Sequence, residues 1–259
     1  LGLPYVQIEA SRAKKRLNGP WSGFAASAET AIDAADLIFY LTDHDLITLK
    51  RHQPDGQILL NLPPFLPSDT LPDACDCGGA DRPMLAVGMM RAGDKLASYR
   101  IIAEVLTLLP KGAWQLHIAG DGPARSDVEA MMKPFGDAVT LLGALDAHAM
   151  SKAYQHASAL LWPGVNEAFG LTYLEAQAAG VPVIAQDRPG VREILAKGSY
   201  PTPEAGARAL AQCFQTLINA PDHHRKQGAG ARAHVAAHHL LPAAAETLKQ
   251  GLALLGVRT

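Results

Sequence analysis

From residue 84 to residue 195 the sequence repeats one pattern, in which a short apolar run is followed by a longer stretch of helical character. Each apolar run has the length of a buried strand, and most of the longer stretches have the length of a helix. Strands that alternate with helices predict a parallel, doubly wound sheet, because each crossover helix must lie over one face of that sheet. The pattern therefore predicts an α/β domain with strands 84–88, 115–119, 139–142, 159–162 and 181–185, and helices 97–109, 124–132, 147–156, 173–179 and 191–195.

A shorter run of the same pattern precedes this domain. Residues 4–8, 37–41 and 57–60 read as strands, and residues 27–35 and 43–50 read as helices. The segment 61–83 is rich in proline and glycine, which break both helices and strands, so it is typical of a linker. We predict a partial N-terminal α/β domain and the start of the linker in residues 1–70, a C-terminal domain in residues 71–240, and a C-terminal helix in residues 241–259 that packs back on the N-terminal domain.

Charge and composition exclude several classes of protein. The 259-residue chain has a formal net charge of −2 and a pI near 6.6, so it lacks the basic balance of most nucleic-acid-binding proteins. No apolar run reaches the ~18 residues of a membrane span, and no signal peptide opens the chain. Three cysteines are too few for a disulfide framework, which indicates a cytoplasmic protein. Cys75 and Cys77 are interpreted as ordinary thiols, because no second ligand pair stands at metal-binding spacing.

In a doubly wound sheet, ligands bind at the loops that leave the carboxyl ends of the strands. The loop that begins at Gly120 reads Gly-Asp-Gly-Pro. Such a loop can bring backbone close to a phosphate, but it is also common as a plain turn. The loop after the first strand of this domain carries Arg91 and Lys95, two cations that either suit a diphosphate or simply face solvent.

A third loop precedes the predicted helix 173–179. Gly170 permits close backbone approach, Thr172 can cap the helix, and the helix N-terminus offers unpaired N–H groups to an anion. Glu175 stands three residues after Thr172, which is the spacing of a capping box, so a structural role is available to it. Glu167 lies before the helix and has no such role, so it can accept hydrogen bonds from the hydroxyl groups of a ligand.

Several motifs of this domain occur in one recognisable order. Glu167 and Glu175 have seven residues between them, and they stand within the longer stretch NEAFGLTYLEAQAAGVPVI. The Gly-Asp-Gly-Pro loop, Leu142-Gly143, and Gly190 with Glu193 fall at matching spacings around it. Together these motifs resemble the nucleotide-binding domain of glycosyltransferase family 4, whose members are retaining enzymes of the GT-B fold. The resemblance covers about residues 84–195 and implies a Rossmann-like donor domain preceded by a partial second α/β domain.

This resemblance implies a donor site for a nucleotide-diphosphate sugar, with no cofactor and no metal ion. Glu167 is implied to orient the donor sugar, and Glu175 to bind the ribose hydroxyls. Lys95 and Arg91 are implied to neutralise the leaving diphosphate, although the place of the family's usual arginine holds Met89 and Arg91 stands later. The other implied contacts are backbone groups near the diphosphate, from Gly120, Gly170, Leu171 and Thr172, and residues that line the base, Leu142, Gly143 and Leu145.

The implied acceptor is a carbohydrate or a lipid-linked molecule, which the family holds mostly in its N-terminal domain. Only about the last third of such a domain is expected here, so the part before Leu1 is expected to be missing. Glu9 stands near the family's acceptor-side histidine and is either an acceptor ligand or an exposed side chain. A basic cluster follows, which either contacts a phosphate or an anionic membrane surface or is a solvated helix face. It comprises Arg12, Lys14, Lys15 and Arg16.

Two other functions fit the same residues. A truncated relative can keep the nucleotide cleft as a binding module without transferring a sugar, and a nucleotide-sugar epimerase or a phosphorylase can share the fold. The pair of Glu167 and Glu175 favours the transferase over the epimerase and the phosphorylase. Asp43-His44-Asp45 spells the metal-binding acid pair of another glycosyltransferase fold, but it stands at a predicted helix start, where capping by Asp43 explains it.

Overall fold

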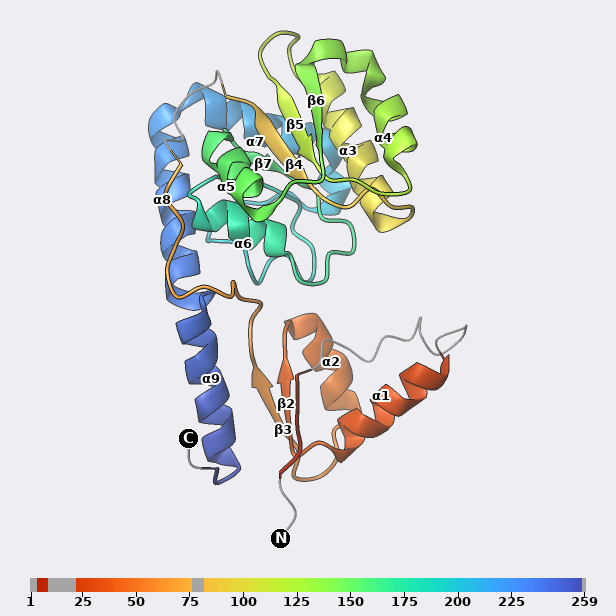
Figure 1. Ribbon diagram of the computed structural model, residues 1–259, viewed down its shortest axis with the longest axis vertical. Helices are drawn as coiled ribbons and strands as arrows, with labels where there is room; N and C mark the ends of the chain where they lie inside the picture. The colour runs from red at the N-terminus through yellow and green to blue at the C-terminus, as the bar shows by residue number, and fades with distance from the viewer. Residues whose placement is uncertain (1–3, 9–21, 76–81, 258–259) are drawn as a thin grey trace. The chain divides into compact units, whose positions relative to one another are not determined.

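The computed structural model describes residues 4–8, 22–75 and 82–257, and the chain divides into two compact units (Figure 1). The larger unit is Leu66–Leu240, and the smaller unit combines Leu1–Phe65 with Leu241–Thr259. The division after Phe65 lies inside the proline-rich segment 61–83. Several predicted features fall outside the described residues, namely Glu9, Cys77 and the basic cluster of Arg12, Lys14, Lys15 and Arg16.

The larger unit is built on a five-stranded parallel sheet, as the alternating pattern predicts. The strands lie in the order β6-β5-β4-β7-β8, so the first strand along the chain is the central one. From β4 the chain adds β5 and β6 on one side of the sheet, and it then returns to add β7 and β8 on the other side. The direction of winding therefore reverses between β4 and β7. The five strands are β4 (Met84–Val87), β5 (Leu116–Ala119), β6 (Val139–Gly143), β7 (Leu160–Leu161) and β8 (Val183–Ile184).

Helices cover both faces of this sheet, which explains why β4, β7 and β8 are continuously apolar, whereas β5 and β6 each include one polar residue, His117 and Thr140. Met84, Leu85, Leu160 and Leu161 are almost completely buried. Helix α3 packs beside α4 and α7, and α6 packs against α8. The helices of this unit are α3 (Asp94–Leu108), α4 (Arg125–Met132), η2 (Lys133–Ala138), α5 (Ala147–His156), α6 (Leu171–Ala178), η3 (Pro203–Ala205), α7 (Gly206–Asn219) and α8 (Pro221–His238).

The smaller unit has a three-stranded parallel sheet in the order β1-β2-β3. One face buries Ile38 against Ile32 and Leu49. The other face buries Leu37 and Phe39 against the C-terminal helix α9, which Figure 1 shows beside the strands. This unit comprises β1 (Val6–Ile8), α1 (Ser22–Ala34), β2 (Leu37–Tyr40), α2 (Asp43–Arg51), β3 (Ile58–Asn61) and α9 (Leu241–Leu254).

Contact between α9 and the sheet is close at one glycine. A Cβ atom on Gly251 would lie 2.4 Å from the Phe39 ring and 2.9 Å from a Leu37 methyl group. A distance below 3.0 Å requires one of the groups to shift, and Phe39 and Leu37 are completely buried. Gly251 therefore lets the backbone of α9 approach the sheet in a way that a larger residue would prevent.

Three predictions of local structure are wrong. Residues 191–195 form turns rather than a helix, because the buried Gln177 side chain donates to the Ile194 carbonyl (2.8 Å) and accepts from the Ala196 N–H (2.7 Å). Thr172 does not cap α6, because Gly170 takes the N-cap position with a φ of 63°. Asp43 does not cap α2, because Thr42 does, and Thr42 and Asp45 form reciprocal hydrogen bonds. Capping by the Thr42 side chain, oriented by the Asp45 carboxylate, therefore explains this acidic segment.

The prediction of an ordinary thiol at Cys75 is also wrong. Cys75 is disulfide-bonded, whereas Cys213 is a free thiol. The low number of cysteines argues against a framework of several bridges, but it does not exclude a single bridge.

Candidate active site

Two of the three charged residues that the sequence predicts to act in catalysis, Lys95 and Glu167, meet at the reversal point of the sheet. Lys95 lies in the first turn of α3, after β4, and Glu167 lies in the loop after β7. Because β4 and β7 are parallel neighbours, the loops that follow them both leave the sheet at the carboxyl ends of its strands. Lys95 Nζ lies 2.6 Å from Glu167 Oε2, and each side chain is 17% exposed. The structure thus brings these residues together as a mostly buried ion pair.

Trp162 holds this ion pair in place. Its indole Nε1 donates a hydrogen bond to Glu167 Oε2 (3.2 Å), and Lys95 Nζ lies 5.3 Å from the centre of its ring. The opposite edge of the indole approaches Gly88, where a Cβ atom would lie only 2.5 Å from the ring. Tyr99 packs edge-on against the same ring at a centroid distance of 5.3 Å. The indole therefore has little freedom, and it restricts the orientation of the carboxylate.

From the sequence alone, Trp162 is predicted only as the end of a strand. A signal was nevertheless present, because the chain is poor in aromatic residues and this tryptophan directly precedes a functional loop. The same loop is attached to α3 by two further contacts. Asn166 Nδ2 donates to Asp94 Oδ1 (2.9 Å), and the Val165 N–H donates to Ser98 Oγ (3.2 Å). The Glu167 loop is therefore positioned by side chains of α3 as well as by its own strand.

Glu175 lies on α6, where Tyr154 of α5 donates a hydrogen bond from its hydroxyl group to Glu175 Oε2 (2.7 Å). Burial raises the pKa of Glu175, and the hydrogen bond from Tyr154 partly opposes that rise. Burial and the nearby carboxylate raise the pKa of the Tyr154 hydroxyl, which therefore stays protonated and can donate. Glu175 thus has a partner on another helix instead of the capping role that its spacing suggests.

The N-terminus of α6 presents unpaired backbone donors. The N–H groups of Gly170, Leu171 and Thr172 form no hydrogen bond with the part of the chain that the structure describes. Gly170 has a left-handed backbone, and a Cβ atom there would lie 2.1 Å from Ile194 Cδ1. Such donors at a helix N-terminus are suited to an anion, because the helix dipole adds to the attraction. Three of the four backbone contacts predicted for the diphosphate therefore lie at one helix end, and the fourth, Gly120, lies in the loop after β5.

The Gly-Asp-Gly-Pro loop packs tightly on the loop after β4. A Cβ atom on Gly120 would lie 2.0 Å from the Gly88 carbonyl oxygen. A Cβ atom on Gly122 would lie 2.4 Å from the Met90 carbonyl oxygen. The Gly120 N–H donates to the Gly143 carbonyl (2.8 Å), so this donor is already occupied. Any contact of Gly120 with a nucleotide would therefore involve its exposed backbone atoms other than the N–H.

The remaining predicted residues form no hydrogen bond or ion pair with Lys95 or Glu167 among the described parts of the chain. Leu142 and Leu145 are partly buried and pack against the core of the unit, and Gly143 has a left-handed φ of 71° at the end of β6. Arg91 is exposed, and its side chain forms no ion pair within the described ranges. Residues 4–8, 22–75 and 82–257 contain no group of three or more His, Cys, Asp or Glu side chains that could hold a metal ion.

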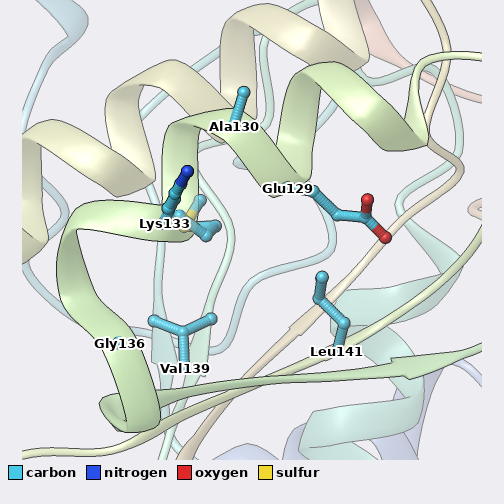
Figure 2. Close-up of a pocket in the computed structure, with 7 residues that line it drawn as sticks. Glu129, Ala130, Lys133, Gly136, Val139 and Leu141 are labelled. Carbon is cyan, nitrogen blue, oxygen red and sulfur yellow. The ribbon is translucent and has the colours of Figure 1, made fainter.

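One cavity of about 380 Å³ lies away from these residues, at the outer edge of the sheet (Figure 2). Val139 and Leu141 of β6 form one side, and Glu129, Ala130 and Lys133 lie on the helical side. The Glu129 carboxylate accepts a hydrogen bond from Arg125 Nε (2.8 Å), so its charge is already paired. None of the residues predicted to bind a donor lines this cavity.

Comparison with known proteins points to one family. Residues 82–220, just over half of the chain, match the family model described as "Glycosyl transferases group 1". A GDP-mannose-dependent alpha-(1-6)-phosphatidylinositol dimannoside mannosyltransferase from Mycobacterium tuberculosis is 32% identical over 122 residues, which are 47% of this chain and 32% of the relative. An alpha-D-kanosaminyltransferase from Streptomyces kanamyceticus is 27% identical over 277 residues, covering 96% of this chain and 70% of the relative.

Solved structures show the same fold over nearly the whole chain. A sucrose-phosphate synthase from Thermosynechococcus elongatus superimposes with a TM-score of 0.78 at 21% identity, covering 99% of this chain and 69% of that protein. A glycosyltransferase involved in lipopolysaccharide biosynthesis has a TM-score of 0.71 at 18% identity, covering 95% of this chain and 74% of that one. The chain thus spans only part of each protein, and about a third of the mannosyltransferase. None of the described helices combines the length and the apolar composition that a bilayer span requires.

Proposed function

The chain belongs to the group 1 glycosyltransferases and has the GT-B fold of that class, and from this premise we propose that it carries the donor side of a retaining sugar-transfer site. The proposed donor is a nucleotide-diphosphate sugar, and the proposed acceptor is a hydroxyl group on a carbohydrate or a lipid-linked molecule. The observation that carries the proposal is the mostly buried ion pair of Lys95 and Glu167 at the reversal point of the sheet. A buried pair of this kind at a ligand-binding position is a candidate functional site.

In the proposed complex, Lys95 leaves Glu167 and binds the diphosphate. A diphosphate carries more negative charge than one carboxylate, so it competes well for the ammonium group when it also receives the N–H groups of Gly170, Leu171 and Thr172. Glu167 is then free to face the sugar. Glu175 binds the ribose, held in orientation by Tyr154.

Catalysis in this proposal is electrostatic. As the bond between the anomeric carbon and the diphosphate oxygen breaks, Lys95 and the N-terminus of α6 stabilise the charge that develops on the leaving group. The carboxylate of Glu167 stabilises positive charge on the sugar. The acceptor oxygen attacks the anomeric carbon from the face that the diphosphate leaves, and its hydroxyl proton passes to the departing diphosphate oxygen. Because Lys95 and the helix N-terminus supply the positive charge, the proposed reaction uses no metal ion.

The first test is calorimetric titration of the 259-residue chain with GDP, UDP and ADP. GDP is the first choice, because the relative from Mycobacterium tuberculosis is named for GDP-mannose. We expect one nucleotide to bind, and we expect Lys95→Ala to weaken it by roughly 10- to 150-fold, which corresponds to the loss of a charge-assisted contact of about 1.5–3 kcal/mol. Lys133→Ala is the matched control, because Lys133 lines the separate cavity beside the edge strand β6.

Transfer is tested separately from binding. The chain is incubated with the matching nucleotide sugar and simple glycoside acceptors, and products are identified by mass spectrometry in the presence and absence of EDTA. Equal affinity of Lys95→Ala and the unchanged chain would refute the assigned donor site. Binding without transfer to any acceptor would favour the alternative function of a nucleotide-binding module.

A further inference from the structure

The loop after β7 is joined to α3 by three consecutive residues, each of which contacts a different residue of that helix. The contacts are a hydrogen bond from the Val165 N–H to Ser98 Oγ (3.2 Å), one from Asn166 Nδ2 to Asp94 Oδ1 (2.9 Å), and the ion pair of Glu167 with Lys95 (2.6 Å). Only the ion pair has a role in the proposed transfer of a sugar. The other two contacts hold the residues that directly precede Glu167.

Asn166 has an unusual backbone conformation. Its φ is 47°, and among the described residues it is the only one other than glycine with a positive φ. A left-handed conformation is unfavourable for any residue with a Cβ atom, although least so for Asn and Asp, and it persists only where the surrounding contacts impose it. Neighbouring side chains of an extended chain point in opposite directions. Here the side chains of Asn166 and Glu167 both reach α3, so the chain turns at Asn166 in a way that serves both contacts.

The ion pair cannot hold this loop once a donor is bound. In the proposed function, on which this inference rests, Lys95 leaves Glu167 and binds the diphosphate. The hydrogen bond from Trp162 Nε1 (3.2 Å) is then the only one left to the Glu167 side chain among the described residues. Asp94 directly precedes Lys95, and Asn166 directly precedes Glu167, so their hydrogen bond connects the same two segments one position earlier. It involves neither member of the ion pair and can persist when they separate.

We propose that Asn166 is a positioning residue, whose hydrogen bond to Asp94 holds the Glu167 carboxylate against the donor sugar when the ion pair is broken. The carboxylate acceptor makes this hydrogen bond charge-assisted, and therefore stronger than a neutral one of the same geometry. A loop that is already held loses less conformational entropy when the sugar binds. The effect should be confined to the sugar, which Glu167 faces, because the nucleotide is bound by Glu175 and the N-terminus of α6.

The test compares GDP with the GDP sugar that binds most tightly, by calorimetric titration of the full chain; UDP or ADP is treated in the same way if it is the nucleotide that binds. Asn166→Asp sets two carboxylates against each other, so affinity for the nucleotide sugar should fall roughly 3- to 10-fold, as expected for one lost hydrogen bond. Affinity for the nucleotide alone should stay unchanged. The double variant Asp94→Asn/Asn166→Asp exchanges donor and acceptor and should restore the lost affinity. Asn219→Asp is the matched control, because it adds the same charge at an exposed position at the end of α7.

Asn166→Gly separates the hydrogen bond from the backbone conformation, because glycine adopts a positive φ readily but has no side chain to donate. It should show the same selective loss as Asn166→Asp. Unchanged affinity for the nucleotide sugar in either variant, an equal loss for both ligands, or a double variant no better than Asn166→Asp would overturn the role of Asn166 alone. Failure of the unchanged chain to bind any nucleotide, or equal affinity after Lys95→Ala, would instead refute the proposed donor site, and the positioning role with it.

Discussion

Gly170 allows a quantitative test of how the N-terminus of α6 is held. Its φ is 63°, and a Cβ atom there would lie 2.1 Å from Ile194 Cδ1 and 2.9 Å from Tyr173 Cδ2. In Gly170→Ala, a left-handed backbone costs about 1–2 kcal/mol. Overpacking against the buried Ile194 adds about 1–3 kcal/mol. The lower entropy of the unfolded alanine chain offsets about 0.4–1 kcal/mol, so the net loss of folding free energy should be about 1–4.5 kcal/mol.

A control variant separates backbone strain from the steric clash. Gly112 has a positive φ of 79° in a turn closed by a hydrogen bond from the Ala113 N–H to the Pro110 carbonyl, but no atom lies within 4 Å of a Cβ atom placed there. Gly112→Ala should therefore cost only about 1 kcal/mol, because strain acts without overpacking. Urea unfolding of both variants, followed by circular dichroism, measures the difference. The double variant with Ile194→Ala should reduce the cost of the alanine at position 170, because the side chain that it meets is shortened.

If Gly170→Ala and Gly112→Ala lose the same folding free energy, the contact with Ile194 is unimportant and only the backbone conformation matters. If Gly170→Ala is more stable than the unchanged chain, the left-handed conformation is not required. In either case, the rigid placement of the N–H groups at the start of α6 would need another explanation.

Three further results are expected from other parts of the molecule. Tyr154→Phe removes the hydrogen bond to Glu175, so nucleotide affinity measured by calorimetry should fall roughly 5- to 10-fold, for a loss of about 1 kcal/mol, with little change in the circular dichroism spectrum. Because burial raises the pKa of Glu175 in the folded chain above its ordinary value of 4.5, the folded chain binds the proton more tightly than the unfolded chain does. Folding free energy should therefore fall as the pH rises from below 4.5 through the raised pKa, and Glu175→Gln should remove that part of the pH dependence in urea unfolding; identical profiles would contradict it. Thr42→Ala removes the reciprocal cap of α2 and should cost about 1 kcal/mol, whereas Thr30→Ala, which removes only an exposed bond within α1, should cost much less in the same assay.

Much of the larger unit can be predicted from the sequence, because its strands are buried on both faces and appear as apolar runs. The proximity of Lys95 and Glu167 follows from the same pattern, since the loops after parallel strands all lie at the carboxyl ends of the strands. The helix predicted at residues 191–195, where the structure has turns, shows that a local sequence pattern does not always determine local structure. The turns at these positions depend on Gln177, which lies earlier in the sequence on α6 and whose side chain forms hydrogen bonds with the backbone of Ile194 and Ala196.

The supporting residues of the candidate site are less predictable for the same reason. Trp162 and Tyr154 act on Glu167 and Glu175 through single side-chain hydrogen bonds between different elements. Apolar periodicity places both aromatic residues in the core, but it carries no information about where the indole N–H or the phenol O–H points. A buried tyrosine or tryptophan must usually find a polar partner, so each one near a predicted loop is worth testing as a support for that loop.

The shared core of the first and last segments affects the order in which the chain can fold during synthesis. On the ribosome, β1 to β3 emerge before α9, so Leu37 and Phe39 have no covering helix until α9 has been translated. The segment Leu66–Leu240 lies between them and can form its own core first. One apolar face of the N-terminal sheet is therefore left open while most of the chain is made, a period in which exposed hydrophobic surface favours binding by chaperones or misassembly. Removal of α9 should leave this apolar face of the sheet uncovered after synthesis is complete as well.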